Sequence, residues 1–168
     1  MKVVVLNGSP RPRGNTAHFA EAFKKGAESA GHEVTVFRLS AMKIAPCLGC
    51  QACKNGSECV QKDDWLQIRD ALREADVLIW ASPIYFWNLT PQLLTAVSRI
   101  YGERPKAKKF GLILSSGAVS DVHDAAIYCF RNTVRYLDAE EIGIKIFTGY
   151  EQLSEENLKE VEAFGASL

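Results

Sequence analysis

The sequence predicts an α/β fold: a doubly wound sheet of five parallel strands in the order 2-1-3-4-5, with helices on both faces. Short apolar runs alternate with stretches of helical spacing along all 168 residues, and such alternation indicates parallel strands joined by crossover helices. Three of the runs are apolar on both faces, as buried central strands are. No repeat or glycine-, serine- or proline-rich linker interrupts the pattern, so we expect one domain over residues 1–168.

The five expected strands differ in their apolar pattern, and that difference orders them. The first, third and fourth, at residues 3–7, 77–81 and 110–115, are apolar at successive positions. The second and fifth, at residues 34–38 and 142–147, alternate apolar residues with polar residues or glycine. Strands of the first kind suit the centre of a parallel sheet and those of the second kind suit its edges. Right-handed crossovers then give the order 2-1-3-4-5.

Helices are expected between the strands, because apolar residues recur there at helical spacing. Asp64 with Gln67 resembles a capping box, and Thr90 before Pro91 places a cap ahead of a proline at a first helical position. The expected buried stripes are Phe19, Phe23, Gly26 and Ala30; Trp65, Ile68, Leu72 and Ala75; Leu93, Val97 and Ile100; and Ile127, Val134 and Leu137.

Composition and charge exclude several classes of protein. With 47% hydrophobic and 24% charged residues, the chain resembles ordinary globular proteins and not disordered or fibrous ones. Basic and acidic side chains, 20 of each, cancel, which leaves no global source for the attraction that dominates nucleic-acid binding. No apolar run approaches the roughly 20 residues of a membrane span, and the first residues predict a strand, not a leader. We therefore expect a cytoplasmic protein that binds neither nucleic acid nor membranes.

The strand order predicts where a ligand binds. Doubly wound sheets bind ligands at the carboxyl ends of their strands, beside the point where the winding reverses, which here lies between strands one and three. Three loops reach that crevice, at residues 8–16, 82–88 and 115–121. The ligand site should therefore be built from these loops.

The first of these loops, GSPRPRGNT, predicts a phosphate site. It opens a helix, whose unpaired N–H groups favour an anion. Ser9, Asn15 and Thr16 lie beside those groups, and Arg11 and Arg13 can add charge-assisted contacts. The loop is neither a Walker A nor a GxGxxG motif, so a monophosphate is favoured over a triphosphate or a dinucleotide. The alternative is a polar loop with a good helix cap.

The second loop, SPIYFWNLTP, carries Tyr85, Phe86 and Trp87 in succession. A flat heteroaromatic ligand would explain these rings, with backbone groups of residues 84–88 reaching its polar edge. The alternative is a subunit interface, where aromatic residues are enriched, and both interpretations can hold together.

The third loop, SSGAVSDVHD, offers small residues for close backbone approach, Ser116 and Gly117, and a helix cap, Ser120 or Asp121. His123 follows, but no nucleophile is paired with it. Because neither a Ser-His-Asp nor a Cys-His arrangement is present, we assign no catalytic side chain.

Four cysteines, Cys47, Cys50, Cys53 and Cys59, lie within a turn-rich loop at residues 44–62. Four thiols suit a [4Fe-4S] cluster, and two CxxC steps sharing Cys50 resemble the ferredoxin pattern, although no proline follows Cys59. Zinc ranks lower, because the CxxC pairs overlap instead of forming separate knuckles. The remaining alternative is a loop without a cluster, with reduced or disulfide-linked cysteines. Cys129 stands alone and is expected to be buried on the fourth helix.

Three segments together resemble the flavodoxin-like NADPH-dependent FMN reductase family and, within it, the iron–sulfur flavoproteins: GSPRPRGNT, CLGCQACKNGSEC ahead of DDW, and SPIYFWNLTPQ. The resemblance covers nearly the whole chain. It implies that these segments hold the FMN phosphate, a [4Fe-4S] cluster and the isoalloxazine ring, respectively. The implied contacts are Ser9, Arg11, Asn15 and Thr16 for the phosphate and Pro83, Ile84, Tyr85, Phe86 and Asn88 for the flavin.

The same resemblance implies an FMN-dependent oxidoreductase that passes electrons between the cluster and FMN, with the chemistry supplied by the cofactors. NAD(P)H is a candidate donor, a redox partner protein or a small molecule is the acceptor, and a homodimer or homotetramer is expected. Two alternatives stay open: a clusterless NAD(P)H-dependent FMN or quinone reductase, and a non-catalytic flavodoxin-like module that binds a protein. Relatives often carry a lysine and an Asp-Arg pair on the third helix, where this chain has Leu94 and Ser98-Arg99.

Overall fold

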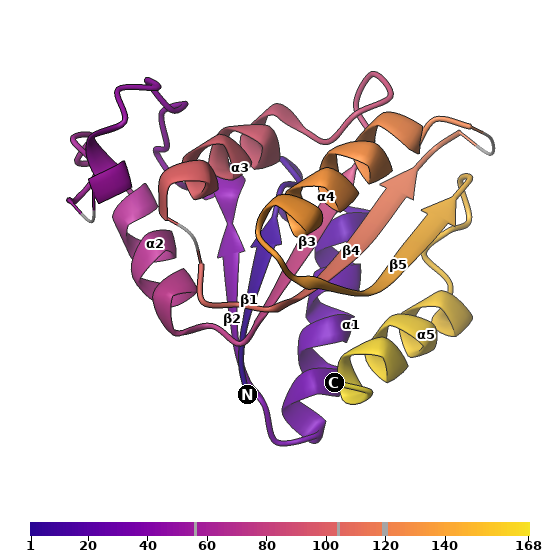
Figure 1. Cartoon of the computed structure of the whole chain (residues 1–168). Helices are drawn as coiled ribbons and strands as arrows, with labels where there is room; N and C mark the ends of the chain where they lie inside the picture. The colour runs from indigo at the N-terminus through magenta and orange to yellow at the C-terminus, as the bar shows by residue number, and fades with distance from the viewer. Residues whose placement is uncertain (56, 104, 119–120) are drawn as a thin grey trace.

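The computed structural model describes residues 1–55, 57–103, 105–118 and 121–168 (Figure 1). Gly56 in the cysteine-rich loop and Ser120, one of two expected helix caps, lie outside the described residues. None of the helices in these ranges has the length and hydropathy that a membrane span requires.

The described residues form five parallel strands in one sheet of order β2-β1-β3-β4-β5, which confirms the predicted fold. Helices α1 and α5 cover one face, and α2, α3 and α4 cover the other (Figure 1). The strands are β1 Lys2–Asn7, β2 Glu33–Arg38, β3 Val77–Pro83, β4 Lys109–Ser116 and β5 Glu140–Thr148. The helices are α1 Asn15–Ser29, α2 Trp65–Glu74, α3 Pro91–Glu103, α4 Asp124–Tyr136 and α5 Glu155–Ala166, with 3-10 turns η1 Leu39–Ala41 and η2 Ala52–Asn55.

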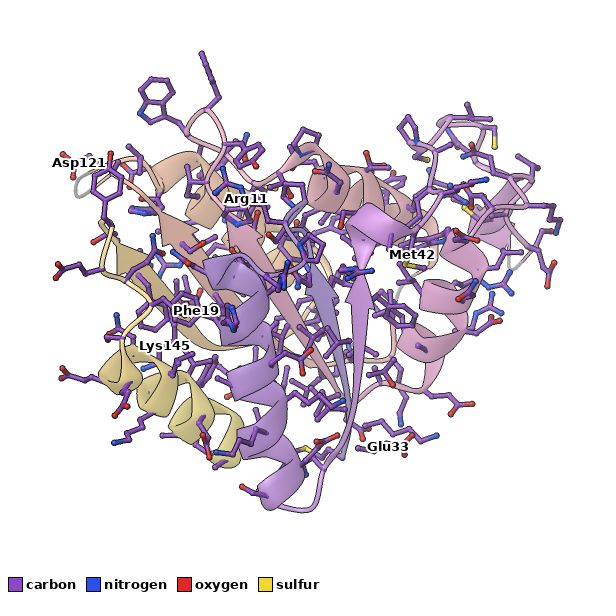
Figure 2. All side chains as sticks on the ribbon, turned by 180° about the vertical axis from the view of Figure 1, so that it is seen from behind. Arg11, Phe19, Glu33, Met42, Asp121 and Lys145 are labelled. Atoms are coloured by element: carbon purple, nitrogen blue, oxygen red, sulfur yellow. The ribbon has the colours of Figure 1, made fainter. Side chains whose placement is uncertain are left out.

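Strand β1 pairs with β2 on one side and β3 on the other, so the winding reverses at β1 and β3. The three central strands are buried almost throughout, whereas β2 and β5 are half-exposed. Arg11, in the loop after β1, lies at the opposite end of the sheet from Glu33 at the start of β2 (Figure 2). That end carries the carboxyl termini of the strands.

Helix α1 is held against α5 and the sheet, which fixes the position of its first turn. Phe19 stacks on Phe147 of β5 with 4.4 Å between ring centroids. Gly26 allows the two helices to touch, since a Cβ at this position would lie 1.8 Å from the Glu162 carbonyl oxygen. On the other face, Trp80 of β3 packs edge-on against Phe130 of α4 at 5.4 Å.

The two predicted helix starts differ in their capping. Thr90 Oγ1 accepts from the Leu93 N–H at 3.4 Å, as expected for a cap of α3. Asp64 makes no side-chain cap of α2, because its φ of −65° and ψ of −10° are helical and a capping residue adopts extended angles. Its carboxylate accepts instead from the Lys43 N–H at 2.7 Å and ties down the segment ahead of the cysteines.

Candidate functional site

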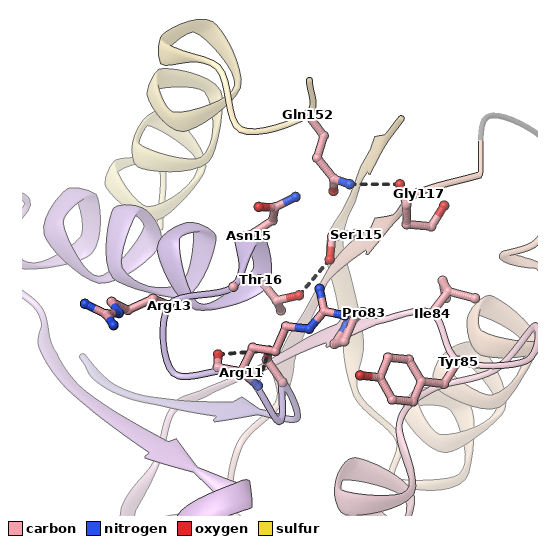
Figure 3. Close-up of a pocket in the computed structure, with 13 residues that line it drawn as sticks. Arg11, Arg13, Asn15, Thr16, Pro83, Ile84, Tyr85, Ser115, Gly117 and Gln152 are labelled. Carbon is pink, nitrogen blue, oxygen red and sulfur yellow. Dashed lines mark hydrogen bonds between the residues drawn. The ribbon is translucent and has the colours of Figure 1, made fainter. Parts of the chain in front are cut away.

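A cavity of about 440 Å³ opens at the carboxyl ends of the central strands, where the winding reverses (Figure 3). Its walls come from the three predicted loops, the start of α1 and one residue after β5. Of the predicted cofactor contacts, Phe86 and Asn88 are not among the lining residues. The walls are formed by Ser9, Arg11, Arg13, Gly14, Asn15, Thr16, Pro83, Ile84, Tyr85, Ser115, Ser116, Gly117 and Gln152.

The loop between β1 and α1 is a turn closed by its own hydrogen bonds. The Ser9 N–H donates to Asn7 Oδ1 at 2.9 Å, the Arg11 N–H donates to Ser9 Oγ at 3.2 Å, and the Gly14 N–H donates to the Arg11 carbonyl at 3.2 Å. The cap position of α1 is Gly14, and no side chain caps this helix. Its first N–H groups are therefore available to an anion. If a polar side chain of the loop capped the helix instead, that side chain would occupy one of these groups.

Hydrogen bonds join the three loops to one another, so the cavity is preformed. The buried hydroxyl of Thr16 bonds to Ser115 Oγ at 2.6 Å (Figure 3). The Ile84 N–H donates to the Ser115 carbonyl at 2.8 Å. Thr90 Oγ1 donates to the Gly8 carbonyl at 2.8 Å and thereby connects the start of α3 to the phosphate loop.

The aromatic loop is a tight hairpin that directs two of its side chains outward. Tyr85 and Asn88 exchange backbone hydrogen bonds of 2.9 and 3.0 Å. Phe86 and Trp87 form its tip at φ values of 51° and 64°, a left-handed conformation that is costly for bulky residues. Their side chains are 93% and 57% exposed, while Asn88 Oδ1 accepts from the Leu89 N–H at 2.8 Å. Only Tyr85 of this group reaches the cavity wall.

Gln152, in the loop after β5, is a lining residue that the sequence did not suggest. It is 5% exposed. Its Nε2 donates to the Ser116 carbonyl at 2.9 Å (Figure 3) and to the Gly149 carbonyl at 2.8 Å. Its Oε1 is buried and has no partner among the described residues. A buried acceptor of this kind needs a donor. An isolated glutamine carries no motif, and the only available signal was its place at the carboxyl edge of the sheet.

The cysteine loop lies beside α2 and α3 (Figure 1) and contains little regular structure apart from η2. Cys47 and Cys50 are exposed, whereas Cys53 and Cys59 are partly buried. Four cysteine thiols form the usual ligand set of an iron–sulfur cluster, so the donor chemistry fits. Across residues 1–55, 57–103, 105–118 and 121–168, however, no three potential ligands converge as a metal site. Cys129 is half-buried on α4, where burial raises the pKa of its thiol.

Contacts with Ser98, Arg99 and Gly102 attach the cysteine loop to α3. The Cys47 N–H donates to Ser98 Oγ at 3.2 Å, and Arg99 Nη2 donates to Cys59 Sγ at 3.2 Å. The Cys53 sulfur lies against Gly102, where a Cβ would be 2.1 Å away from it. The α3 positions that hold the loop were not predicted from the sequence.

Comparisons with known proteins agree on family and fold. The family model for NADPH-dependent FMN reductases matches residues 1–149. An iron-sulfur flavoprotein from Archaeoglobus fulgidus is 33% identical over 174 residues, covering 100% of this chain and 79% of that protein.

Two solved structures are similar in fold. An NAD(P)H:quinone oxidoreductase from Methanothermobacter marburgensis gives a TM-score of 0.78 at 18% identity and covers 99% of this chain and 95% of that one. An FMN-dependent NADH-azoreductase from Bacillus anthracis in complex with FMN gives 0.75 at 15% identity, with 99% of each chain covered. The family match and the full-length relative show that this chain belongs to the NADPH-dependent FMN reductase family and is an FMN-dependent oxidoreductase.

Proposed function

We propose that the chain is an iron–sulfur flavoprotein, with residues 1–168 as one FMN-binding domain and Cys47, Cys50, Cys53 and Cys59 as ligands of a [4Fe-4S] cluster. FMN exchanges one or two electrons and such a cluster exchanges one, so the pair connects hydride donors with single-electron carriers. The observation that carries the proposal is the preformed cavity, which combines an uncapped helix start with a wall of apolar and aromatic residues. The cluster is supported by the four-thiol ligand set and by the name of the Archaeoglobus relative.

The residues of the cavity divide between the two ends of FMN. The first N–H groups of α1 and the Ser9 hydroxyl would bind the phosphate, with Arg11 and Arg13 supplying positive charge. The Oε1 of Gln152, a buried acceptor without a partner among the described residues, would accept from a hydroxyl of the ribityl chain. The ring system would lie against the residues that line the other end of the cavity, Pro83, Ile84, Tyr85, Ser116 and Gly117.

The exposed hairpin tip supports association of subunits. Phe86 and Trp87 place two large apolar side chains in solvent, and such side chains are enriched at interfaces. We assign them to the contact of a homodimer or homotetramer, where Phe86 and Asn88 would approach a flavin. The chain would act in the cytoplasm, with NAD(P)H as donor and a redox protein or small molecule as acceptor.

A clusterless NAD(P)H-dependent FMN or quinone reductase is the second candidate. It is favoured by the loop geometry, since the described cysteines do not converge on one point. The cavity would serve this function unchanged.

Anaerobic purification with iron, sulfide and flavin analysis tests these proposals. The iron–sulfur flavoprotein should contain about four irons and four sulfides per chain together with FMN. FMN without iron would support the reductase instead. Absence of flavin, with no FMN binding in titration, would leave the non-catalytic binding module.

A further inference from the structure

We infer that Arg99 is a positioning residue for the cysteine ligands: its buried guanidinium fixes both ends of the cysteine loop on α3, and its bond to Cys59 raises the reduction potential of the cluster. This inference rests on the proposed cluster. It concerns a residue on a helix, outside the cysteine motif.

The Arg99 side chain is 2% exposed, and a buried cation is tolerated only when it is well paired. Its partner is Asp63, whose two carboxylate oxygens accept from Nη1 at 2.9 Å and from Nη2 at 3.2 Å. The guanidinium carbon also lies 5.6 Å from the centroid of the Trp65 ring at the start of α2. Arg99 is therefore held in one orientation by charge, hydrogen bonds and ring contact.

The Arg99–Asp63 pair closes the base of the loop. Nη1 also donates to the Ala45 carbonyl at 2.8 Å, and Asp63 Oδ2 accepts from the Ala45 N–H at 2.9 Å. Ala45 precedes Cys47 and Asp63 follows Cys59, so one ion pair fixes the segments on both sides of the four cysteines. The entropy of bringing those ends together is lost before any cluster binds.

The contact with Cys59 gives Arg99 an electronic role as well. Nη2 donates to Cys59 Sγ at 3.2 Å, and an arginine keeps its proton at every ordinary pH. A permanent positive donor at a ligand sulfur stabilises the more negative, reduced form of a cluster. Hydrogen bonds to the sulfurs are one of the features that set cluster potentials.

The neighbours of Arg99 on α3 complete a platform for the loop, formed by Ser98, Arg99 and Gly102. Ser98 holds the Cys47 backbone, and Gly102 leaves the space that the Cys53 sulfur occupies. Thr90, the residue just before this helix, is bonded to the phosphate loop. About 14 Å of helix separates Thr90 from Arg99, so α3 is a rigid spacer between the flavin cavity and the cysteines.

The test compares Arg99→Lys and Gly102→Ala with wild type and with Arg131→Met, all purified anaerobically with FMN bound. Arg131 is the control because it lies on α4 and forms an exposed fork with Glu141 of β5, not with the cysteine loop. Iron retention under a chelator and the midpoint potentials of cluster and flavin are measured. FMN content reports whether each variant folds.

Arg99→Lys keeps the positive charge but loses the two guanidinium nitrogens that contact Asp63, Ala45 and Cys59. The variant should therefore bind iron about 10–100-fold more weakly. The reduction potential of its cluster should be more negative than in wild type, and that of the flavin unchanged. Gly102→Ala alters no charge and should improve helix propensity. It should nevertheless lose iron, because its Cβ takes the place of the Cys53 sulfur. Both variants should retain FMN.

The inference is overturned if wild type holds a cluster and both variants match Arg131→Met in iron retention and cluster potential. That outcome leaves the proposed function intact. FMN without iron in wild type overturns the cluster itself, and the role of Arg99 with it.

Discussion

The flavin cavity and the cysteine loop are built in different ways. The cavity consists of short loops at strand ends, and bonds such as Thr16 to Ser115 and Thr90 to Gly8 join them. The cysteine loop is a longer segment with exposed Cys47 and Cys50, attached mainly through α3. The folded loops at the strand ends already form the cavity. The four cysteines lie on a loop that is fixed at its base, so the bound metal has to bring them together. The two sites should therefore respond differently to substitution.

The largest expected effect separates the two regions outright. Cys50→Ser should abolish nearly all iron binding, because a cluster needs its thiolate ligands, while FMN content and the thermal unfolding of the iron-free protein stay unchanged. Iron and flavin analysis of the anaerobically purified variant measures this. Cys129→Ser, on α4, is the control and should keep its iron. Loss of FMN along with the iron would show that the flavin cavity depends on the cysteine loop and would contradict their independence.

A second substitution tests which end of the ligand the cavity holds. Arg11→Ala should weaken FMN binding by about 1.5–3 kcal/mol, the usual value of a charge-assisted hydrogen bond, and leave riboflavin binding unchanged because riboflavin has no phosphate. Flavin fluorescence titration of the deflavinated protein gives both dissociation constants. Arg38→Ala, exposed at the end of β2 and outside the cavity, should change neither. Equal weakening of both ligands would place the phosphate elsewhere.

The preformed region is also the one that the sequence predicted better. Strand order followed from which runs are apolar on both faces, and the loop after β1 lines the cavity as expected. That this loop binds a phosphate stays a prediction. Phe86 and Asn88, which were expected beside a ligand, do not line the cavity. The Tyr85–Asn88 backbone pairing puts Phe86 at an exposed hairpin tip, and the Asn88 side chain accepts from the Leu89 N–H. No composition or periodicity encodes such a hairpin, because it depends on two specific backbone bonds.

The residues that the sequence did not reveal are polar groups whose burial depends on another segment. From the sequence alone, Arg99 is expected to be a solvent-facing helix residue, but in the structure its side chain is buried by contacts with Asp63 and Ala45. Gln152 is inconspicuous until Ser116 and Gly149 take its two N–H donors. In both cases the chemistry arises from tertiary contacts between distant segments, which local patterns do not report.

Stability should reveal how tightly the cavity is attached to α3. A Cβ at Gly8 would lie 2.5 Å from Thr90 Oγ1 and 2.9 Å from Leu93 Cβ, so Gly8→Ala should lower the free energy of unfolding by about 1–3 kcal/mol. Denaturant unfolding of the cofactor-free protein measures it. Gly117→Ala, whose Cβ would have no neighbour within 4 Å, should stay within about 0.5 kcal/mol of wild type. Equal stability of the two variants would mean that α3 does not constrain the phosphate loop.

The smallest effect concerns acid sensitivity, which should come from His123 and not from the cysteine loop. Burial lowers the pKa of His123, at the start of α4, against the opposing influence of Asp124 and Asp121. The unfolded chain then binds a proton more readily, so stability should fall as the pH drops below about 6.5. The slope is at most about 1.4 kcal/mol per pH unit, and His123→Gln should flatten it in urea unfolding between pH 5 and 7.5.

The ion pair at the base of the cysteine loop should not contribute in this range. Burial raises the pKa of Asp63, but hydrogen bonds from Arg99 and the Ala45 N–H outweigh it and hold the pKa below its ordinary value. Its stabilising contribution is therefore complete above the ordinary carboxyl range and is lost only as the pH falls through that lowered pKa. If His123→Gln kept the wild-type slope between pH 5 and 7.5, another group would be responsible for the acid sensitivity. The pKa of His123 would then be the same in the folded and the unfolded chain.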